Sequence, residues 1–173
     1  MSNAMPLPLY AIGLGSNRRH VRFGDPRAVL LAALAALESD DIEAVDASPI
    51  IASDPIGPSR RRYANAVALV ASPLSPPEML ERLQAIEASF GRRTGQRWSA
   101  RTLDLDILLW SGGTWSDAAL TIPHPAVEQR AFVLGPLRAI VPEWQHPLHG
   151  RSVRQLAARL SRPKPVDRTA SAH

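Results

Sequence analysis

The sequence predicts an α+β fold of the ferredoxin-like type, an antiparallel sheet with a βαββαβ core, both core helices on one face, and C-terminal helical additions. Two observations carry this prediction. Short apolar runs and two segments of helical periodicity follow one another as strand, helix, strand, strand, helix, strand. Turn and cap residues separate these segments. The chain also has no cysteine, which excludes a disulfide framework and a cysteine zinc site.

The first strand is expected in the apolar run from Leu7 to Leu14, and the turn Gly15-Ser16-Asn17 follows it. Further along, Asp25 and Pro26 are residues typical of the N-cap and of the first position of a helix. The first helix is therefore expected from Pro26 to Glu38.

The remaining core elements are predicted from the same kinds of signal. Strand-forming apolar runs alternate with turn residues and with a segment of helical spacing. The expected elements are strands at Ile42 to Ile51 and Tyr63 to Ala71, a loop from Ser53 to Arg62, a helix from Ser75 to its stop at Gly91, and a fourth strand at Arg101 to Trp110.

A glycine turn follows the core, and then the segment Thr121 to His124. Helices are expected at about Ala126 to Leu137 and at Ser152 to Leu160. We expect a single domain over residues 5–160. Residues 1–4 resemble a remnant of an expression vector, and the polar residues 161–173 are expected to form a flexible tail.

The chain has 173 residues and a formal net charge of +4, which suggests a polyanionic partner. However, 19 of its 20 basic residues are arginines, and many of these stand singly beside apolar segments instead of forming one stripe. Arginine binds phosphate bidentately, so a small phosphorylated ligand fits better than nucleic acid. No membrane-spanning run or signal peptide is evident, and a cytoplasmic monomer is expected.

Two carboxylates, Asp104 and Asp106, stand two residues apart in an apolar run that follows several arginines. Alternate residues of a strand share a face, so both side chains should project together while Leu103, Leu105 and Ile107 enter the core. Adjacent anions of this kind favour a cation between them, and hard oxygen ligands favour Mg²⁺ with substrate phosphates. A solvated strand face is the alternative, and the neighbouring arginines weigh against it.

Several separated motifs occur in a fixed order. They are Gly15-Ser16-Asn17, Pro55-Ile56-Gly57, Tyr63-Ala64-Asn65, Gln84 with Glu87, Gly91-Arg92, the run Arg97-Trp98-Ser99-Ala100-Arg101-Thr102-Leu103-Asp104-Leu105-Asp106, and Pro123-His124 with Arg130 and Phe132. From Ala11 to about Arg151 the chain resembles the 6-hydroxymethyl-7,8-dihydropterin pyrophosphokinase family. That resemblance implies transfer of pyrophosphate from ATP to a pterin alcohol in folate biosynthesis.

The resemblance implies two Mg²⁺ ions bound by Asp104 and Asp106, with Arg92 and Arg101 as catalytic arginines. The residues that match the family's ATP site are Gln84, Glu87, Arg97, Trp98, Arg101, Ile107, Thr121, His124 and Arg130. Those that match its pterin site are Ser53, Pro55, Ile56, Tyr63, Asn65, Asp104 and Phe132. Taken alone, Tyr63 and Phe132 could equally be core aromatics, and Gln84 and Glu87 could be solvated helix surface.

The chain departs from the family pattern in three places. Its loop from Arg18 to Gly24 is longer and is either a tolerated insertion or an arm that reaches phosphates. Pro125 and Ala119 stand where some members have tyrosine and arginine, so one nucleotide contact each is in doubt. We also expect residues 92–97 to be disordered without ligand and to close over ATP.

Two rival functions belong to other classes. A nucleotidyltransferase also pairs carboxylates on an open sheet, but its Gly-Ser motif usually lies near them, whereas Ser16 and Asp104 are far apart. An RNA-recognition sheet shares the topology but needs aromatics on its central strands, where this chain has aspartates.

Overall fold

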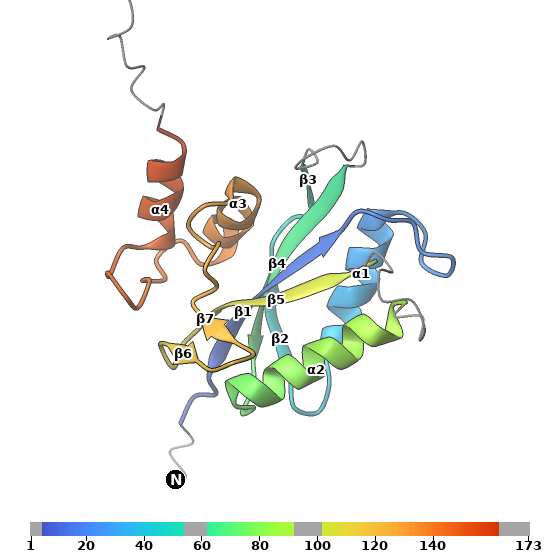
Figure 1. Ribbon diagram of the computed structural model, residues 1–173, viewed down its shortest axis with the longest axis horizontal. Coiled ribbons are helices and arrows are strands. Elements are labelled where there is room, and N and C mark those ends of the chain that lie inside the picture. Colours follow the sequence, from blue (N-terminus) through green and yellow to red (C-terminus); the bar gives the residue numbers. More distant parts are fainter. Residues whose placement is uncertain (1–4, 54–61, 92–101, 163–173) are drawn as a thin grey trace, which may run out of the picture.

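The structure is a computed structural model that describes residues 5–53, 62–91 and 102–162. Figure 1 shows its elements, which follow one another as β1 (Leu9–Ser16), α1 (Pro26–Leu37), β2 (Glu43–Ala47), β3 (Ile51–Ser53), β4 (Tyr63–Ala71), α2 (Pro76–Ser89), β5 (Asp104–Trp110), β6 (Trp115–Ser116), β7 (Thr121–Ile122), α3 (Ala131–Ile140) and α4 (Val153–Leu160).

The main sheet has the order β2-β4-β1-β5, and each pair of neighbours is antiparallel. The short strand β3 pairs with the same strand β4 beyond the end of β2. The four core strands therefore follow the ferredoxin-like order, with the first and third strands in the centre. This confirms the predicted fold class.

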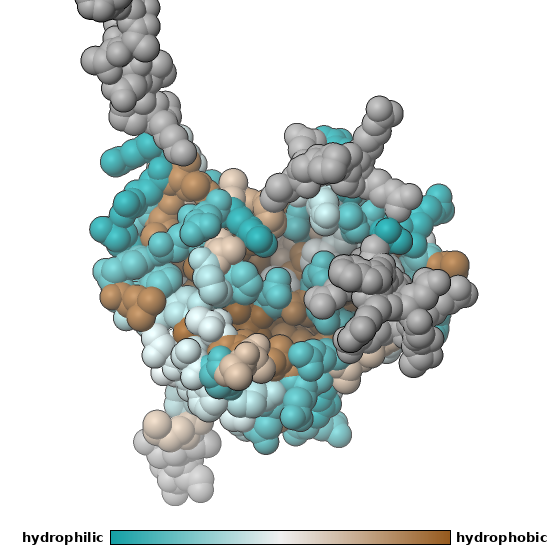
Figure 2. All heavy atoms as spheres, viewed as in Figure 1, coloured by the Kyte–Doolittle hydropathy of each residue, from teal (hydrophilic) through white to brown (hydrophobic). Residues whose placement is uncertain are grey.

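The two faces of the sheet bury different residues. On one face Tyr10, Ile12 and Leu14 of β1 pack with α1 and α2 in the larger core. On the other face Ala11 and Val67 pack with apolar residues of α3 and α4. Figure 1 shows α3 and α4 on the side of the sheet away from α1 and α2. Hydrophilic side chains border the apolar centre that is visible in Figure 2.

A ferredoxin-like sheet with both core helices on one face leaves its second face free, and here this face is free only in part. The helices α3 and α4 cover the part around Ala11 and Val67. These helices leave uncovered the end of the face that carries Gly15 and Asp104. At this end no large apolar side chain projects from β1. A ligand on this face is therefore restricted to one end of the sheet.

The strand predicted from Ile42 to Ile51 is divided, and a local contact explains why. Ser48 donates its N–H to the Val67 carbonyl at 2.8 Å, and its hydroxyl accepts the Val67 N–H at 2.9 Å. The serine side chain thus replaces one bond of the backbone ladder, and Pro49 has no N–H to continue it. The chain resumes pairing at Ile51 as β3.

The predicted helix caps are confirmed. The Asp25 carboxylate accepts the Ala28 N–H at 2.9 Å at the start of α1. At α2 the Glu78 carboxylate accepts the Ser75 N–H and hydroxyl at 2.8 and 2.7 Å. Gly91 follows this helix with φ of 125°, a conformation that favours glycine. Local cap chemistry therefore decides where both core helices begin.

The helix predicted from Ala126 to Leu137 begins too early. Residues 126–129 form turns instead, in which Val127 donates to the His124 carbonyl at 3.0 Å and Gln129 to the Ala126 carbonyl at 3.1 Å. Arg130 is the N-cap, and α3 then runs to Ile140. The two-stranded sheet of β6 and β7 was not predicted, because each strand has only two residues.

The predicted vector remnant and most of the predicted tail lie outside the described residues. Among the residues that are described, no helix is both long enough and apolar enough to cross a bilayer.

The core predicts a stability difference between two leucines of the helical layer. Leu83 of α2 is completely buried, whereas Leu31 of α1 is 52% exposed. Leu83→Ala should lower the free energy of unfolding by about 2–5 kcal/mol because it leaves a cavity. Denaturant unfolding measures this change, and Leu31→Ala is the matched control. Equal effects of the two substitutions would contradict the assigned packing.

Candidate active site

The paired aspartates lie on β5 as the alternation predicted. Asp104 is half-buried and Asp106 is exposed, whereas Leu105 and Ile107 between and after them are buried in the larger core. Asp104 pairs with Gly15 of β1, and Asp106 pairs with Gly13. Both carboxylates therefore stand on the same sheet face, beside two residues that have no side chain.

Across β1, the same glycine pairs with the strand that carries the candidate ring-binding residues. Gly15 is opposite Asn65 of β4 as well as Asp104 of β5. A Cβ added to Gly15 would lie 3.6 Å from Asn65 Oδ1, and one added to Gly13 would lie 3.2 Å from the Leu108 side chain. We call Gly13 and Gly15 the glycine floor. The Leu108 side chain lies over Gly13, whereas Gly15 leaves the sheet surface bare between β5 and β4.

The glycine floor was not predicted from the sequence, in which Gly15 stands in a motif with Ser16 and Asn17. The detectable signal was the spacing of two residues between Gly13 and Gly15, which places both on one face of a strand whose other face carries Leu14 and Ser16.

A hydrogen bond fixes the amide of Asn65, which is only 7% exposed. Its Nδ2 donates to Ser53 Oγ at 2.7 Å, so Oδ1 is the oxygen that faces the glycine floor. Ser53 itself pairs with Tyr63. Three of the predicted pterin residues, Ser53, Tyr63 and Asn65, are therefore brought together at the end of β3 and β4.

Two contacts hold the beginning of β5 in place. The buried Ser16 hydroxyl donates to the Thr102 carbonyl at 2.6 Å. Glu87 of α2 accepts the Leu105 N–H at 2.7 Å through Oε1. That N–H lies between the two aspartates on the edge strand, where the sheet supplies no acceptor. Glu87 thus contacts the backbone of the acidic strand, while Gln84 on the same helix is exposed.

The remaining predicted nucleotide residues divide into two groups. Thr121 lies exposed on β7, and His124 follows it, with its N–H donating to the Leu108 carbonyl at 3.0 Å. His124 Nδ1 accepts the Ala126 N–H at 3.0 Å. Ile107, by contrast, is 2% exposed and faces the larger core, so its side chain cannot contact a nucleotide and only its backbone remains available.

Arg130 and Phe132 lie at the start of α3, a helix that contacts both β3 and β4. The Arg130 guanidinium carbon is 5.7 Å from the centre of the Phe132 ring, a cation–π arrangement. The predicted residues Pro55, Ile56, Arg92, Arg97, Trp98 and Arg101 lie outside the described residues, as does the predicted closing loop at 92–97.

The long loop from Arg18 to Gly24 is tied back on itself and to α2. His20 and Gly24 exchange two backbone hydrogen bonds of 2.7 and 2.9 Å. The rings of Phe23 and Phe90 stack with centres 4.7 Å apart, and the His20 ring lies 4.7 Å from that of Phe23. The loop therefore packs against the end of α2, the helix that carries Glu87.

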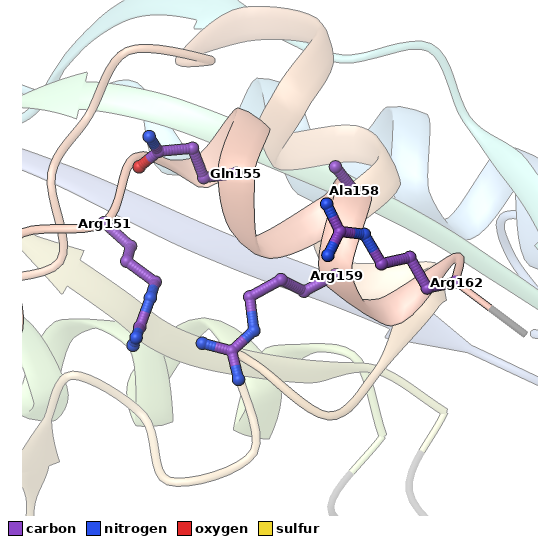
Figure 3. Close-up of a pocket in the computed structure, with 5 residues that line it drawn as sticks. All are labelled: Arg151, Gln155, Ala158, Arg159 and Arg162. Carbon is purple, nitrogen blue, oxygen red and sulfur yellow. The ribbon is translucent and has the colours of Figure 1, made fainter. Parts of the chain in front are cut away.

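A separate hollow of about 310 Å³ lies along α4, lined by Arg151, Gln155, Ala158, Arg159 and Arg162. Figure 3 shows that all five belong to α4 or its flanks. No residue of this hollow lies on β1, β4 or β5, and none was predicted as a site residue. The candidate site is the open end of the sheet and not this hollow.

The fold and the site together define an enzyme domain of the ferredoxin-like class with two carboxylates and an amide around a bare stretch of sheet. The model of the 7,8-dihydro-6-hydroxymethylpterin-pyrophosphokinase family matches residues 11–142. The match covers most of the chain, and the chain belongs to this family.

Relatives named 2-amino-4-hydroxy-6-hydroxymethyldihydropteridine pyrophosphokinase support this assignment. The protein of Synechocystis is 39% identical over 145 residues, which are 84% of this chain and 72% of the relative. The Pseudomonas aeruginosa protein is 40% identical over 149 residues, 85% and 88% of the two chains. The Methylorubrum extorquens protein is 35% identical over 159 residues, 91% and 96% of the two chains.

Solved structures are similar in fold. A crystal structure of "HPPK-DHPS in complex with substrates" matches with a TM-score of 0.71 and 13% identity, over 90% of this chain and 43% of the other. Wild-type Plasmodium falciparum HPPK-DHPS with pteroate matches with a TM-score of 0.67 and 14% identity, over 92% and 43%. This chain thus spans less than half of those longer chains, and the likeness concerns the fold.

The hydrogen bond from the Leu105 N–H to Glu87 predicts that replacing Glu87 lowers the turnover number while the protein remains folded. Glu87→Ala removes the acceptor for the Leu105 N–H, loosens the strand between the aspartates, and should lower kcat by about tenfold or more. Steady-state assays measure this change. Glu81→Ala, an exposed glutamate of the same helix, is the control and should leave kcat within twofold of the parent chain's value. Equal kcat values for the two variants would contradict the positioning role.

Proposed function

We propose that this chain transfers pyrophosphate from ATP to the hydroxymethyl group of 6-hydroxymethyl-7,8-dihydropterin, giving the pterin diphosphate and AMP in folate biosynthesis. Family membership supplies the activity. The observation that supports the site is the row Asp104, Gly15, Asn65 across three neighbouring strands. It sets a carboxylate and a fixed amide on either side of a surface without side chains, which suits two substrates that must meet.

Asp104 and Asp106 are the proposed ligands of two Mg²⁺ ions. The donor set fits, because both are carboxylates on one face, next to a glycine floor that leaves room for phosphates and water. Bound magnesium would supply charge neutralisation for the triphosphate. The chain's own part is to hold the two carboxylates in register, through the pairing with β1 and through Glu87.

The nucleotide is proposed to lie on the β5 side. His124 has its Nδ1 occupied by the Ala126 N–H, so the proton of the neutral ring is on Nε2, which can donate to a phosphate oxygen. Arg130 supplies a bidentate cation nearby in the chain. The other proposed contacts are Gln84, Glu87, Thr121 and the Ile107 backbone, with Arg92, Arg97, Trp98 and Arg101 carried over from the family motifs.

The pterin is proposed to lie on the β4 side. A flat heteroaromatic ring needs stacking surfaces and a donor–acceptor edge, which Tyr63, Phe132 and Asn65 can supply. The Ser53 hydroxyl orients the Asn65 amide so that Oδ1 faces the floor. Pro55 and Ile56 are proposed to complete the ring site.

The proposed reaction is an in-line displacement. The pterin hydroxyl oxygen forms a bond to the β-phosphorus of ATP while the bond from that phosphorus to the α,β-bridging oxygen breaks. AMP leaves with the bridging oxygen, and the hydroxyl proton passes to solvent. Such transfers depend on positioning and charge more than on a general base, and no described side chain needs to take that role.

We further propose that the enzyme acts as a cytoplasmic monomer that uses neither nucleic acid nor a membrane. All of its basic residues but one are arginines, whose planar guanidinium binds phosphate bidentately and therefore suits a small phosphorylated substrate.

One assay tests this function together with the roles of the aspartates. With Mg²⁺, ATP and the hydroxymethyl dihydropterin, the chain should release AMP and not ADP. Asp104→Asn and Asp106→Asn should each lower kcat by about 10²-fold or more, because each removes a proposed metal carboxylate. Asp40→Asn, an exposed aspartate in a turn, should leave the rate unchanged. ADP as product would contradict the function, and near-parental rates of either variant would contradict the metal site.

A further inference from the structure

A cluster of three titratable side chains lies apart from the candidate site. Glu128 belongs to the turns before α3, and His146 and His149 belong to the turn before α4. The Glu128 carboxylate contacts Nε2 of His149 and lies 3.8 Å from Nε2 of His146. Three potential ligand atoms, one per residue, lie within 4.8 Å of one another. The cluster could therefore hold either a metal ion or protons.

The hydrogen bonds of the two rings decide between these alternatives. His146 Nδ1 accepts the Leu148 N–H at 3.4 Å, and His149 Nδ1 accepts the Arg151 N–H at 3.2 Å. In each neutral ring the proton is therefore on Nε2, the atom that faces Glu128. A metal at Nε2 would require the proton on Nδ1, pointing at a backbone N–H.

The orientation of the rings supports the same choice. The two imidazoles are stacked with centres 4.2 Å apart and planes 7° apart. Ring nitrogens bind metals through lone pairs in the ring plane, and in parallel rings these directions run side by side and do not meet at one ion. The His149 Nε2–H can donate to the Glu128 carboxylate, and His146, 3.8 Å from it, stacks on the His149 ring, so the cluster fits a proton held between His149 and Glu128.

The position of Glu128 in the chain gives the cluster a consequence. Glu128 lies between His124 and Arg130, in turns closed by the bond from the Val127 N–H to the His124 carbonyl. Val127 is 2% exposed and His146 is 6% exposed, so both halves of the cluster are anchored in the interior. In the part of the chain that the structure describes, the contacts of Glu128 with His146 and His149 thus join the segment 124–130 to the turn 146–151.

We propose that Glu128, His146 and His149 form a carboxylate–histidine clasp that positions His124 and Arg130 to receive the phosphates of ATP. Glu128 is a positioning residue, because it acts through its neighbours and does not contact the substrate. The proposal rests on the proposed function of the site.

The charges around Glu128 make the clasp sensitive to acid. The hydrogen bond from His149 lowers the Glu128 pKa and burial opposes it. The positive charges of Arg151 and of the two imidazoles, once these are protonated, also lower it. Burial lowers the pKa of His146 below its ordinary 6.5. Both shifts favour the folded state when His146 is neutral and Glu128 is ionised. Stability from the clasp is therefore present above pH 6.5 and is lost in two stages as the pH falls, first at His146 and then at Glu128.

Glu128→Gln tests the positioning role without changing the shape of the side chain. It replaces a charged acceptor by a neutral one, and the KM for ATP should rise about fivefold, which corresponds to one hydrogen bond of about 1 kcal/mol. The KM for the pterin and kcat should stay within twofold. The control is Glu143→Gln, an exposed glutamate that pairs with Arg154 in the same part of the chain.

An unchanged KM for ATP, or a fall in kcat alone, would overturn the positioning role while AMP release by the parent chain still supports the function. If the parent chain releases no AMP, the function and the positioning role fall together.

A second measurement tests the clasp without ATP. Nitrogen NMR of the imidazole rings should find both His146 and His149 protonated on Nε2, and added Zn²⁺ should leave these resonances unchanged. Stoichiometric Zn²⁺ binding that shifts them and is lost in His149→Ala would overturn the proposal in favour of a metal site.

Discussion

The register in which β1 pairs with both of its neighbours is the constraint on which the site depends. It aligns Asp104, Gly15 and Asn65 in one row and Asp106, Gly13 and Val67 in the next. Because strand side chains alternate with a period of two, a slip of one residue would turn both aspartates into the core and bring Leu105 to the surface. The buried faces of β1, β4 and β5 prevent that slip, since Leu14, Ala66 and Leu105 pack together under α1 and α2. Core packing thus fixes the geometry of the candidate site.

The C-terminal helices give this site its boundary. Once α3 and α4 cover Ala11 and Val67, the exposed part of the second face is the end that carries the acidic strand and the glycine floor. The same chain segment brings His124 beside β5, through the bond from its N–H to the Leu108 carbonyl, and starts α3 with Arg130. One addition to the ferredoxin-like core therefore both closes the sheet and supplies the candidate phosphate contacts.

Strand alternation and cap residues were enough to predict the fold class, the face shared by the aspartates, and the start of α1 and α2. The division of the second strand was not predictable from apolar pattern, because it depends on the Ser48 hydroxyl reaching Val67 across the sheet. The start of α3 was misplaced because the turns after His124 satisfy their own backbone. The roles of Glu87 and of the glycine floor depend on strand partners that periodicity does not identify, so they required the three-dimensional structure.

The central claim is that the bare sheet between Asp104 and Asn65 is where the pterin binds. Calorimetric titration of the hydroxymethyl dihydropterin into Gly15→Ala tests it directly. The added methyl would lie 3.6 Å from Asn65 Oδ1, an ordinary contact, so the fold should keep its stability. The account predicts a loss of pterin affinity of about tenfold or more, since the methyl occupies the ring's place and separates it from the amide. Unchanged pterin affinity in a stably folded Gly15→Ala chain would contradict the account.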